Sequence, residues 1–166
     1  ERWRHVLEAS HAPAPWRDSP VGVVRASDRR KRWRVLVLDA CTPTPDRDSG
    51  SVRMLAILRL LLDLDCSVVF LNEAQAHDGD YTRALQQLGV EAWWHPWSRG
   101  LPRWLSQYGE QFDLVIGSRH YVLEPLLPLL RLHAPQAQVV FDTVDLHFLR
   151  EERAAEGAGN AAAKAA

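Results

Sequence analysis

The sequence predicts an α/β protein with a doubly wound, parallel, Rossmann-like sheet of five strands or slightly more. Five short apolar runs, most of them rich in β-branched residues, alternate with segments whose apolar residues recur at helical spacing. The loops between them are short, and 166 residues are enough for one full core. Such alternation favours right-handed crossovers in a parallel sheet. The usual strand order, 3-2-1-4-5, places the topological switch point between the first and fourth strands.

A strand and a helix early in the chain form the unit around which the rest is organised. Residues 35–38 are apolar and too few for a helix, so they predict a strand covered on both faces and followed by Asp39. Pro43 and Pro45 exclude both a helix and a central strand, so a loop follows. Asp48 or Ser49 can cap the next helix. Its apolar positions are Met54, Ile57, Leu58, Leu61 and Leu64.

The same signals predict the remaining elements in order. Further strands, all of them buried, are expected at residues 67–71, 90–94, 113–117 and 138–141, and helices at 81–88, 101–111, 121–133 and from Leu146 onward. Gly89 suits the left-handed position that ends a helix, and Pro102 suits a first helical turn. We therefore expect the domain to span residues 34–156.

The two ends are expected to lie outside this domain. Residues 1–33 contain three prolines and read as a linker or arm, partly ordered, with a short helix at residues 2–10. The basic cluster at residues 29–32, next to Trp33, is interpreted as a solvated domain edge; contact with anionic lipid or nucleic acid is the alternative. Residues 157–166 form an alanine-rich tail. We expect the chain to be an excised part of a longer polypeptide.

Composition excludes several classes of protein. The chain carries 20 Lys and Arg against 21 Asp and Glu, so no global field attracts nucleic acid. Cys41 and Cys66 cannot form a disulfide framework and are expected to be partly buried thiols in a reducing cytosol. No transmembrane span or signal peptide is visible. The predicted location is cytoplasmic, with peripheral contact at the inner membrane face left open.

Three loops are expected to converge at the switch point, after the first, fourth and fifth strands. The first has neither GxGxxG nor a phosphate-binding GxxxxGK[ST] motif. Instead, Ser49, Gly50 and Ser51 begin a helix, where small residues let backbone N–H groups approach a phosphate. The alternative is that Ser49 only caps the helix and Gly50 relaxes the turn.

The other two loops carry most of the ionisable candidates. Arg119 suits a phosphate or carboxylate of a substrate, and His120 beside it is a second binding candidate or a capping residue. Asp142 ends the fifth strand and is a substrate-binding candidate. Asp145 and His147 are the catalytic candidates, because a histidine held by a carboxylate can act as a general base.

No metal site and no cofactor are predicted. Asp46 and Asp48 form an Asp-x-Asp pattern, but Arg47 between them favours an ion-paired loop. The residues after the fifth strand lack an obvious fourth ligand. Four tryptophans also gather around the third strand. Aromatic faces stack on sugar rings, whereas packing is the preferred interpretation for Trp93 and Trp104.

Four stretches then carry a resemblance: RVLVLDACTPTPDRDSGSVRM, YTRALQQLGVE, FDLVIGSR and VVFDTVDLHFLRE. Together they resemble the N-terminal domain of bacterial glycosyltransferases of the family 4 type, which have the GT-B fold. PDRDSG and DTVDLHFLRE are the specific parts, and the resemblance covers residues 34–156. The first loop is longer and richer in proline than the Gly-Gly version usual in that family.

The resemblance implies the acceptor-side half of a retaining enzyme. Such an enzyme moves a sugar from a nucleotide-sugar donor to a glycan or lipid-linked acceptor of the cell surface. The missing C-terminal half would bind the nucleotide and carry paired glutamates, so the fragment alone is expected to be inactive. No metal is expected. By position, Ser49, Gly50 and Ser51 match the loop near the donor diphosphate, and His147 lies near the acceptor-side histidine.

A non-catalytic Rossmann-like binding or interaction module of a polysaccharide-biosynthesis protein is the alternative to the enzyme. A receiver-type signalling domain is excluded, because the acidic pair expected after the first strand is replaced by Asp39, Ala40 and Cys41.

Overall fold

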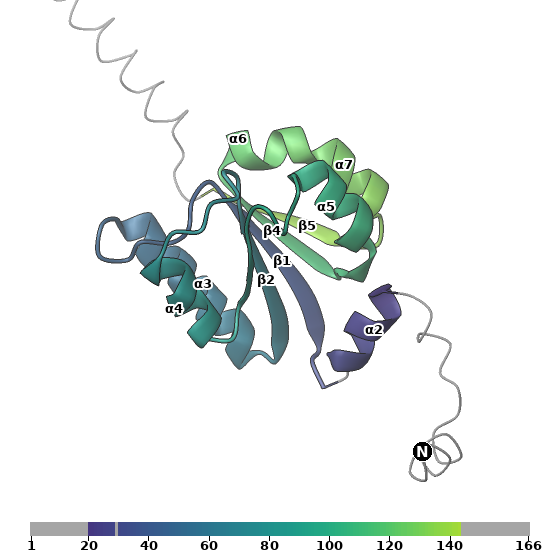
Figure 1. Cartoon of the computed structure of the whole chain (residues 1–166), viewed down its shortest axis with the longest axis horizontal. Coiled ribbons are helices and arrows are strands. Elements are labelled where there is room, and N and C mark those ends of the chain that lie inside the picture. The colour runs from purple at the N-terminus through teal and green to yellow at the C-terminus, as the bar shows by residue number, and fades with distance from the viewer. Residues whose placement is uncertain (1–19, 29, 144–166) are drawn as a thin grey trace, which may run out of the picture.

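The computed structural model describes residues 20–28 and 30–143 and shows a layered α/β fold. A five-stranded sheet has all neighbours parallel, in the order β3-β2-β1-β4-β5, which confirms the predicted order. Helices α3 and α4 cover one face, and α5, α6 and α7 cover the other (Figure 1). The strands are β1 Trp33–Asp39, β2 Cys66–Asn72, β3 Glu91–Trp93, β4 Leu114–Ser118 and β5 Gln138–Asp142. The helices are α2 Pro20–Ser27, α3 Ser49–Asp63, α4 Asp80–Gln87, α5 Leu101–Tyr108, α6 His120–Leu123 and α7 Leu127–His133, with 3₁₀ turns η1 Gly109–Gln111 and η2 Glu124–Leu126.

The central strand has side chains buried on both faces of the sheet. Leu36 and Leu38 point into the core beneath α5–α7, whereas Val35 and Val37 point into the core beneath α3 and α4. This alternation is the period of two that a strand imposes, and it explains why β1 reads as a continuous apolar run. Because β1 is the middle strand of the five, its last residue lies at the middle of the carboxyl edge of the sheet.

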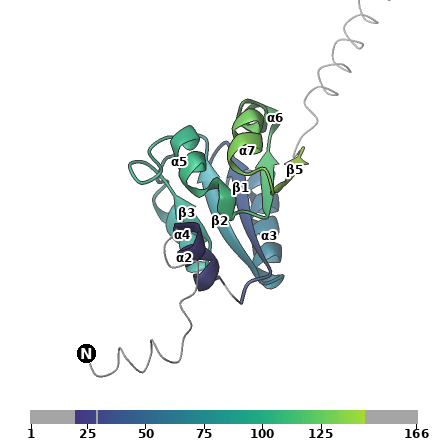
Figure 2. The same cartoon turned by 90° about the vertical axis from the view of Figure 1, so that its right-hand side faces the viewer.

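The fifth strand differs from the prediction. Its first four residues, 138–141, are exposed, and Val140 and Phe141 each keep 46% of their surface accessible. β5 lies at one margin of the sheet and β3 at the other (Figure 2). The expectation of five buried strands was therefore wrong for β5, because an edge strand has only one neighbouring strand to help cover it. Only Asp142, its last residue, is buried.

The helix expected at residues 121–133 is divided into three pieces. Pro125 falls in η2 and Pro128 in the first turn of α7, and each lacks the N–H that an uninterrupted helix would need. The helix expected at residues 101–111 likewise ends at Tyr108 and continues as η1. Gly89 has φ +96°, as the predicted helix end requires.

One helix appears inside the predicted linker. α2 spans Pro20–Ser27, and Asp28 just after it accepts a hydrogen bond from Arg34 Nη1 at 2.5 Å. The contact ties this segment to β1, which begins at Trp33, one residue before the predicted boundary. The helix expected at residues 2–10, the helix expected from Leu146 and the tail lie outside the described residues. Within the described part, no helix has both the length and the apolar character needed to cross a membrane.

Candidate functional site

The last residue of the central strand supplies a buried carboxylate at the carboxyl edge of the sheet. Asp39 is 5% exposed, and its Oδ1 accepts hydrogen bonds from the Ala40 N–H at 2.7 Å and from Arg119 Nε at 3.1 Å. Burial raises the pKa of Asp39, while the Ala40 bond and the Arg119 charge oppose that shift. Asp39 therefore combines a carboxylate with a neighbouring cation at the switch point.

Arg119 is held there by its backbone. It follows β4 with φ +69°, a region that favours glycine, and its N–H donates to the Asp142 carbonyl oxygen at 3.3 Å. Its Nη1 also donates to the Tyr121 hydroxyl at 3.2 Å. A strained backbone held by contacts on two sides is typical of residues that must point in one direction. Here the guanidinium points toward Asp39, at the end of β1.

Asp142 provides a second carboxylate at the same edge. It is 8% exposed, and its Oδ1 accepts from Arg53 Nη2 at 2.5 Å, which links β5 to the beginning of α3. Its Oδ2 is buried and has no hydrogen-bond partner among the described residues. Ser118 pairs with Asp142 in the sheet register, and its Oγ is also buried without a partner in the described part. A buried polar atom without a partner is costly, so both atoms are available to a ligand or to water.

These five residues, Asp39, Arg53, Ser118, Arg119 and Asp142, are called the carboxyl-edge cluster. The charge of Asp142 raises the pKa of Asp39, so the two carboxylates act on each other electrostatically. Two arginines accompany them, and each makes one ion pair. Carboxylates accept hydrogen bonds from substrate hydroxyls, and guanidinium groups bind phosphates or carboxylates. The cluster is therefore suited to a polyhydroxylated ligand that also carries an anionic group.

A neutral pair of side chains lies beside the cluster at the end of β2. Asn72 is 3% exposed, and its Nδ2 donates to Thr42 Oγ1 and to the Ala76 carbonyl, both at 2.9 Å. Its Oδ1 accepts from the Ala76 N–H at 2.9 Å. All of these atoms are occupied within the protein, so Asn72 fixes the loops after β1 and β2.

The small residues at the start of α3 are placed mainly by a helix cap. Asp48 is the capping residue: its Oδ1 accepts from the Ser51 N–H at 2.7 Å, and its Oδ2 accepts from the Ser51 hydroxyl at 2.6 Å. Ser51 is buried, whereas Ser49 is exposed and Gly50 is half-buried. The Ser51 N–H and hydroxyl are thus already bonded, which leaves Ser49 and Gly50 as the accessible part of the predicted phosphate loop.

Both carboxylates of the Asp-x-Asp pattern make contacts within the protein. Asp46 accepts from the Tyr81 hydroxyl at 2.8 Å, and the Arg47 guanidinium lies over the Tyr81 ring. Asp48 is used by the cap. Among the described residues, no three histidine, cysteine or acidic side chains gather in a way that would hold a metal ion.

Of the three further predicted site residues, only His120 is described by the structure, and it is not part of the cluster. His120 is exposed, lies edge-on to the Tyr121 ring and lines a hollow of about 370 Å³ between α6, α7 and β5. Asp145 and His147, the predicted catalytic pair, lie outside the described residues. Their chain continues from Thr143, directly after the cluster residue Asp142.

Sequence reasoning missed three members of the cluster. Asp39 is the last residue of its strand, as Asp142 is, and that shared position was the available signal. Ser118 falls just outside the strand predicted at residues 113–117, although it is the last residue of β4 and is fully buried. Arg53 gave no signal, because its pairing with Asp142 joins residues that are far apart in the sequence.

The two cysteines are free and differ in burial. Cys41, after the end of β1, is exposed, whereas Cys66 at the start of β2 is buried. The expectation of two partly buried thiols was therefore wrong for Cys41. Its exposure follows from its place in the loop rather than in the strand.

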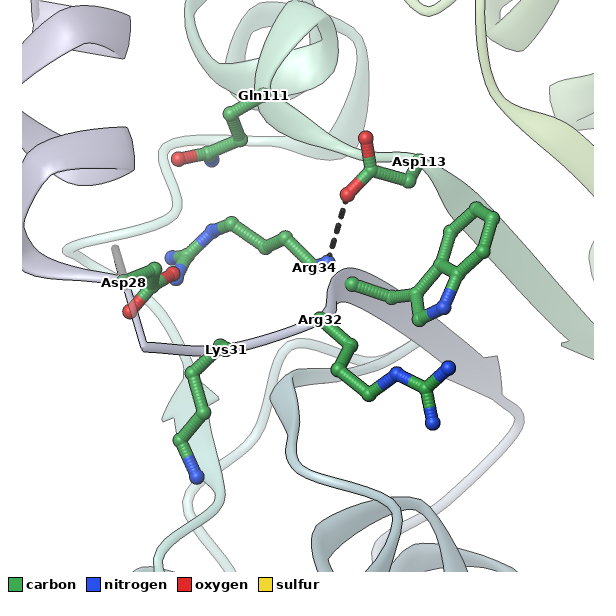
Figure 3. A pocket seen from close by; sticks show the side chains of 7 residues that line it. Asp28, Lys31, Arg32, Arg34, Gln111 and Asp113 are labelled. Carbon is green, nitrogen blue, oxygen red and sulfur yellow. Dashed lines mark hydrogen bonds and ion pairs between the residues drawn. The ribbon is translucent and has the colours of Figure 1, made fainter.

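The amino edge of the sheet carries a separate hollow of about 260 Å³ (Figure 3). In it the Arg34 side chain reaches toward Asp28, while Lys31 and Arg32 extend away from it. The Arg34 N–H donates to Asp113 Oδ2 at 2.8 Å. Because Arg34 is already paired, and Lys31 and Arg32 are exposed, this region agrees with a solvated domain edge rather than a built anion site.

Comparisons with protein-family models, curated proteins and solved structures gave no match for this chain.

Proposed function

We propose that the chain is the acceptor-side half of a glycosyltransferase, which moves a sugar from a nucleotide-sugar donor to a surface glycan or lipid-linked acceptor. The observation that carries the proposal is the carboxyl-edge cluster, where Asp39 and Asp142 lie beside Arg119 and Arg53. Ligands of parallel sheets bind outside this edge. Three of the four stretches that resemble the family 4 type contain or end in the loops after β1, β4 and β5, whereas YTRALQQLGVE covers α4 and the start of β3.

Four members of the cluster have a direct role in this proposal. Arg119, 28% exposed in its side chain, would bind an anionic group such as the phosphate of a lipid-linked acceptor. Asp142 Oδ2 and Ser118 Oγ, which have no hydrogen-bond partner in the part of the chain that the structure describes, would bind acceptor hydroxyls. Asp39 would hold the Arg119 guanidinium in place. His147, with Asp145, remains the proposed catalytic base or hydroxyl-binding group, and the nucleotide would be bound mainly by a second domain.

The decisive experiment measures sugar transfer by the longest natural polypeptide that contains these 166 residues. Arg119→Ala should lower turnover about 10²-fold, because the charge-assisted contact to the acceptor is lost. The matched control is Arg103→Ala, which removes an exposed arginine from α5. His147→Ala is measured alongside. Wild-type activity in both Arg119→Ala and His147→Ala would contradict the assignment of these residues.

The 166-residue chain alone should bind acceptor but show no turnover of any nucleotide sugar. The physical reason is that the donor site and its paired glutamates belong to the other half of the proposed enzyme. Hydrolysis or transfer is measured by release of the nucleoside diphosphate. Turnover by the isolated chain would refute the division of labour between two halves.

The alternative is a non-catalytic Rossmann-like module that binds a glycan or a protein. It agrees with the same fold and the same cluster. In that case the longest natural polypeptide would bind a lipid-linked sugar without transferring any, and Arg119→Ala would weaken binding alone.

A further inference from the structure

The tryptophans at the β3 edge form a hollow of about 330 Å³ that the proposed function does not use. It is lined by Glu91, Ala92, Trp93, Trp94 and Trp97. Trp97 is 67% exposed, which is unusual for so large an apolar side chain. Trp104, the fourth tryptophan of this group, is by contrast 1% exposed and belongs to the core. The preferred packing interpretation therefore holds for Trp104 and does not extend to Trp97.

Two walls of the hollow are fixed by contacts within the domain. Trp93 packs edge-on against Trp104 and tilted against Tyr108, with ring centroids 5.6 and 5.1 Å apart. Trp94 meets the His77 ring edge-on at 4.7 Å. The positions of both indoles are thus set before any ligand binds, which lowers the entropic cost of binding.

The loop that presents Trp97 is also held in place. Gln75 Oε1 accepts from the Ser98 hydroxyl at 2.5 Å and from the Gly100 N–H at 3.0 Å. The His95 N–H donates to the Gln75 carbonyl at 2.8 Å, and Ser98 itself is 1% exposed. Trp97 therefore projects from an anchored loop, and its exposure does not result from a lack of contacts on either side.

The polar wall of the hollow selects the chemistry of the ligand. The Trp93 indole N–H donates to Glu91 Oε1 at 2.7 Å, so it is not available to a ligand carbonyl. The Glu91 side chain remains 45% exposed, although its Oε2 is paired with Arg34 at 2.6 Å. The hollow thus offers a carboxylate acceptor beside indole faces. The carboxylate disfavours anions, and it cannot donate to the carbonyl acceptors that proline-rich peptides mainly present.

We propose that the hollow formed by Trp93, Trp94 and Trp97 binds a neutral carbohydrate, with a sugar ring stacked on the exposed Trp97 indole and hydroxyls donating to Glu91. A sugar ring has an apolar C–H face and a rim of hydroxyl donors, and these match the two surfaces of the hollow. The site lies at the β3 margin, with β2 and β1 between it and β4. It requires no sugar transfer and is independent of the proposed function.

The test uses the 166-residue chain labelled with 5-fluorotryptophan, because each indole then gives its own ¹⁹F signal. Maltohexaose, cellohexaose and chitohexaose are titrated separately, up to about 10 mM, the range of weak stacking interactions. At least one should shift the Trp97 signal in a saturable way and leave that of Trp33 unchanged. Trp33, half-exposed at the start of β1, is the internal control.

Variants decide whether stacking is the cause. Trp97→Ala should weaken binding roughly tenfold or more, whereas Trp97→Tyr should retain most of it, because an aromatic face is kept. Trp33→Ala should leave affinity unchanged. The proposal is overturned if no sugar shifts the Trp97 signal, or if Trp97→Ala binds as well as the wild type. It is also overturned if the Trp97 signal responds only to protein concentration or to a proline-rich decapeptide.

Discussion

At the scale of single residues, the main feature of the carboxyl edge is the buried carboxylate of Asp39. Its carboxylate is almost fully buried, and among the described residues one cation, Arg119, and one backbone N–H, that of Ala40, compensate for the lost water. The loss of water outweighs the contacts with Ala40 and Arg119, so the pKa of Asp39 is raised above 3.8. Keeping the buried Asp39 ionised therefore lowers the stability of the folded protein, and this loss of stability can be measured.

The stability that Asp39 contributes should fall as the pH rises. Between 3.8 and its raised pKa, the folded state binds the proton more tightly than the unfolded state does, so protonation favours folding. That contribution is fully present below 3.8 and is lost as the pH rises through the folded-state pKa. Asp39→Asn cannot titrate. The free energy of unfolding of the wild type minus that of Asp39→Asn should therefore decrease with rising pH in urea titrations; a constant difference would contradict the burial argument.

Asp48, which caps the start of α3, should show the opposite dependence of stability on pH, because its pKa is lowered rather than raised. Bonds from the Ser51 hydroxyl and N–H lower the pKa of Asp48, so its contribution is present above 3.8 and is lost as the pH falls through the lowered value. At neutral pH, Asp48→Ala should destabilise the protein by about 1 kcal/mol.

Asp48→Asn is the control for this prediction. Asparagine caps helices about as well as aspartate, so most of the stability should remain, without the dependence on acid. Urea unfolding at neutral and acid pH measures both variants. Equal stability of Asp48→Ala and the wild type at neutral pH would show that the cap is not needed.

At the scale of elements, two glycines allow the helices on one face to pack closely against their neighbours. A Cβ added to Gly109, at the end of α5, would lie 2.4 Å from the carbonyl oxygen of His133 in α7. Gly117 in β4 faces Leu123 of α6 just as closely, at 2.5 Å from a side-chain carbon. The first contact is to backbone, so α5 and α7 must separate if it is filled.

Gly109→Ala should therefore destabilise the protein by roughly 1–3 kcal/mol through overpacking. The free energy of unfolding in urea measures the effect. Ser106→Ala, on the exposed side of α5, serves as the matched control and should stay within about 0.5 kcal/mol of the wild type. Wild-type stability of Gly109→Ala would mean that α5 and α7 lie farther apart than described.

The two edge strands of the sheet, β3 and β5, differ in length and in the apolar surface that they expose. β3 is three residues long and ends in the tryptophan hollow, whereas β5 is longer and exposes Val139, Val140 and Phe141. Apolar side chains on a sheet edge are a liability unless something covers them. Among the described residues, nothing covers this side of β5 fully.

At the scale of the whole molecule, Arg34 joins parts of the chain that are distant in sequence. Its guanidinium donates to Asp28 after α2, to Ser67 in β2 and to Glu91 in β3, at 2.5, 2.8 and 2.6 Å. The Arg34 side chain is 8% exposed and lies over the Phe112 ring. One residue therefore holds α2 and two strands at the amino edge.

Arg34→Gln should destabilise the whole domain by about 1–3 kcal/mol, because several charge-assisted bonds disappear together. The partially exposed Asp28 and Glu91 regain water, which keeps the cost below that of a fully buried pair. Urea unfolding measures the change, with Arg103→Gln as the exposed control. Arg34→Lys should restore little, since a single ammonium cannot make the forked contacts. A wild-type midpoint for Arg34→Gln would show that α2 is held by other contacts.

The sequence by itself determined the layered α/β class and the strand order. Periods of two and of 3.6 residues are local patterns, and right-handed crossovers leave few topologies for five alternating units. It also indicated that the loops holding Ser49, Arg119 and Asp142 end on one edge, because all of them follow parallel strands. It did not show that β5 is exposed or that α2 forms a helix, since both depend on neighbours.

Only the tertiary structure decided which side chains meet. Arg53 and Asp142 are 89 positions apart, and Arg119 and Asp39 are 80 apart, so no local pattern joins them. Likewise, the sequence favoured packing for Trp104, which is buried, but it did not show how exposed Trp97 is. Secondary structure follows from short-range sterics and periodicity, whereas ion pairs and burial depend on which distant surfaces the fold brings together.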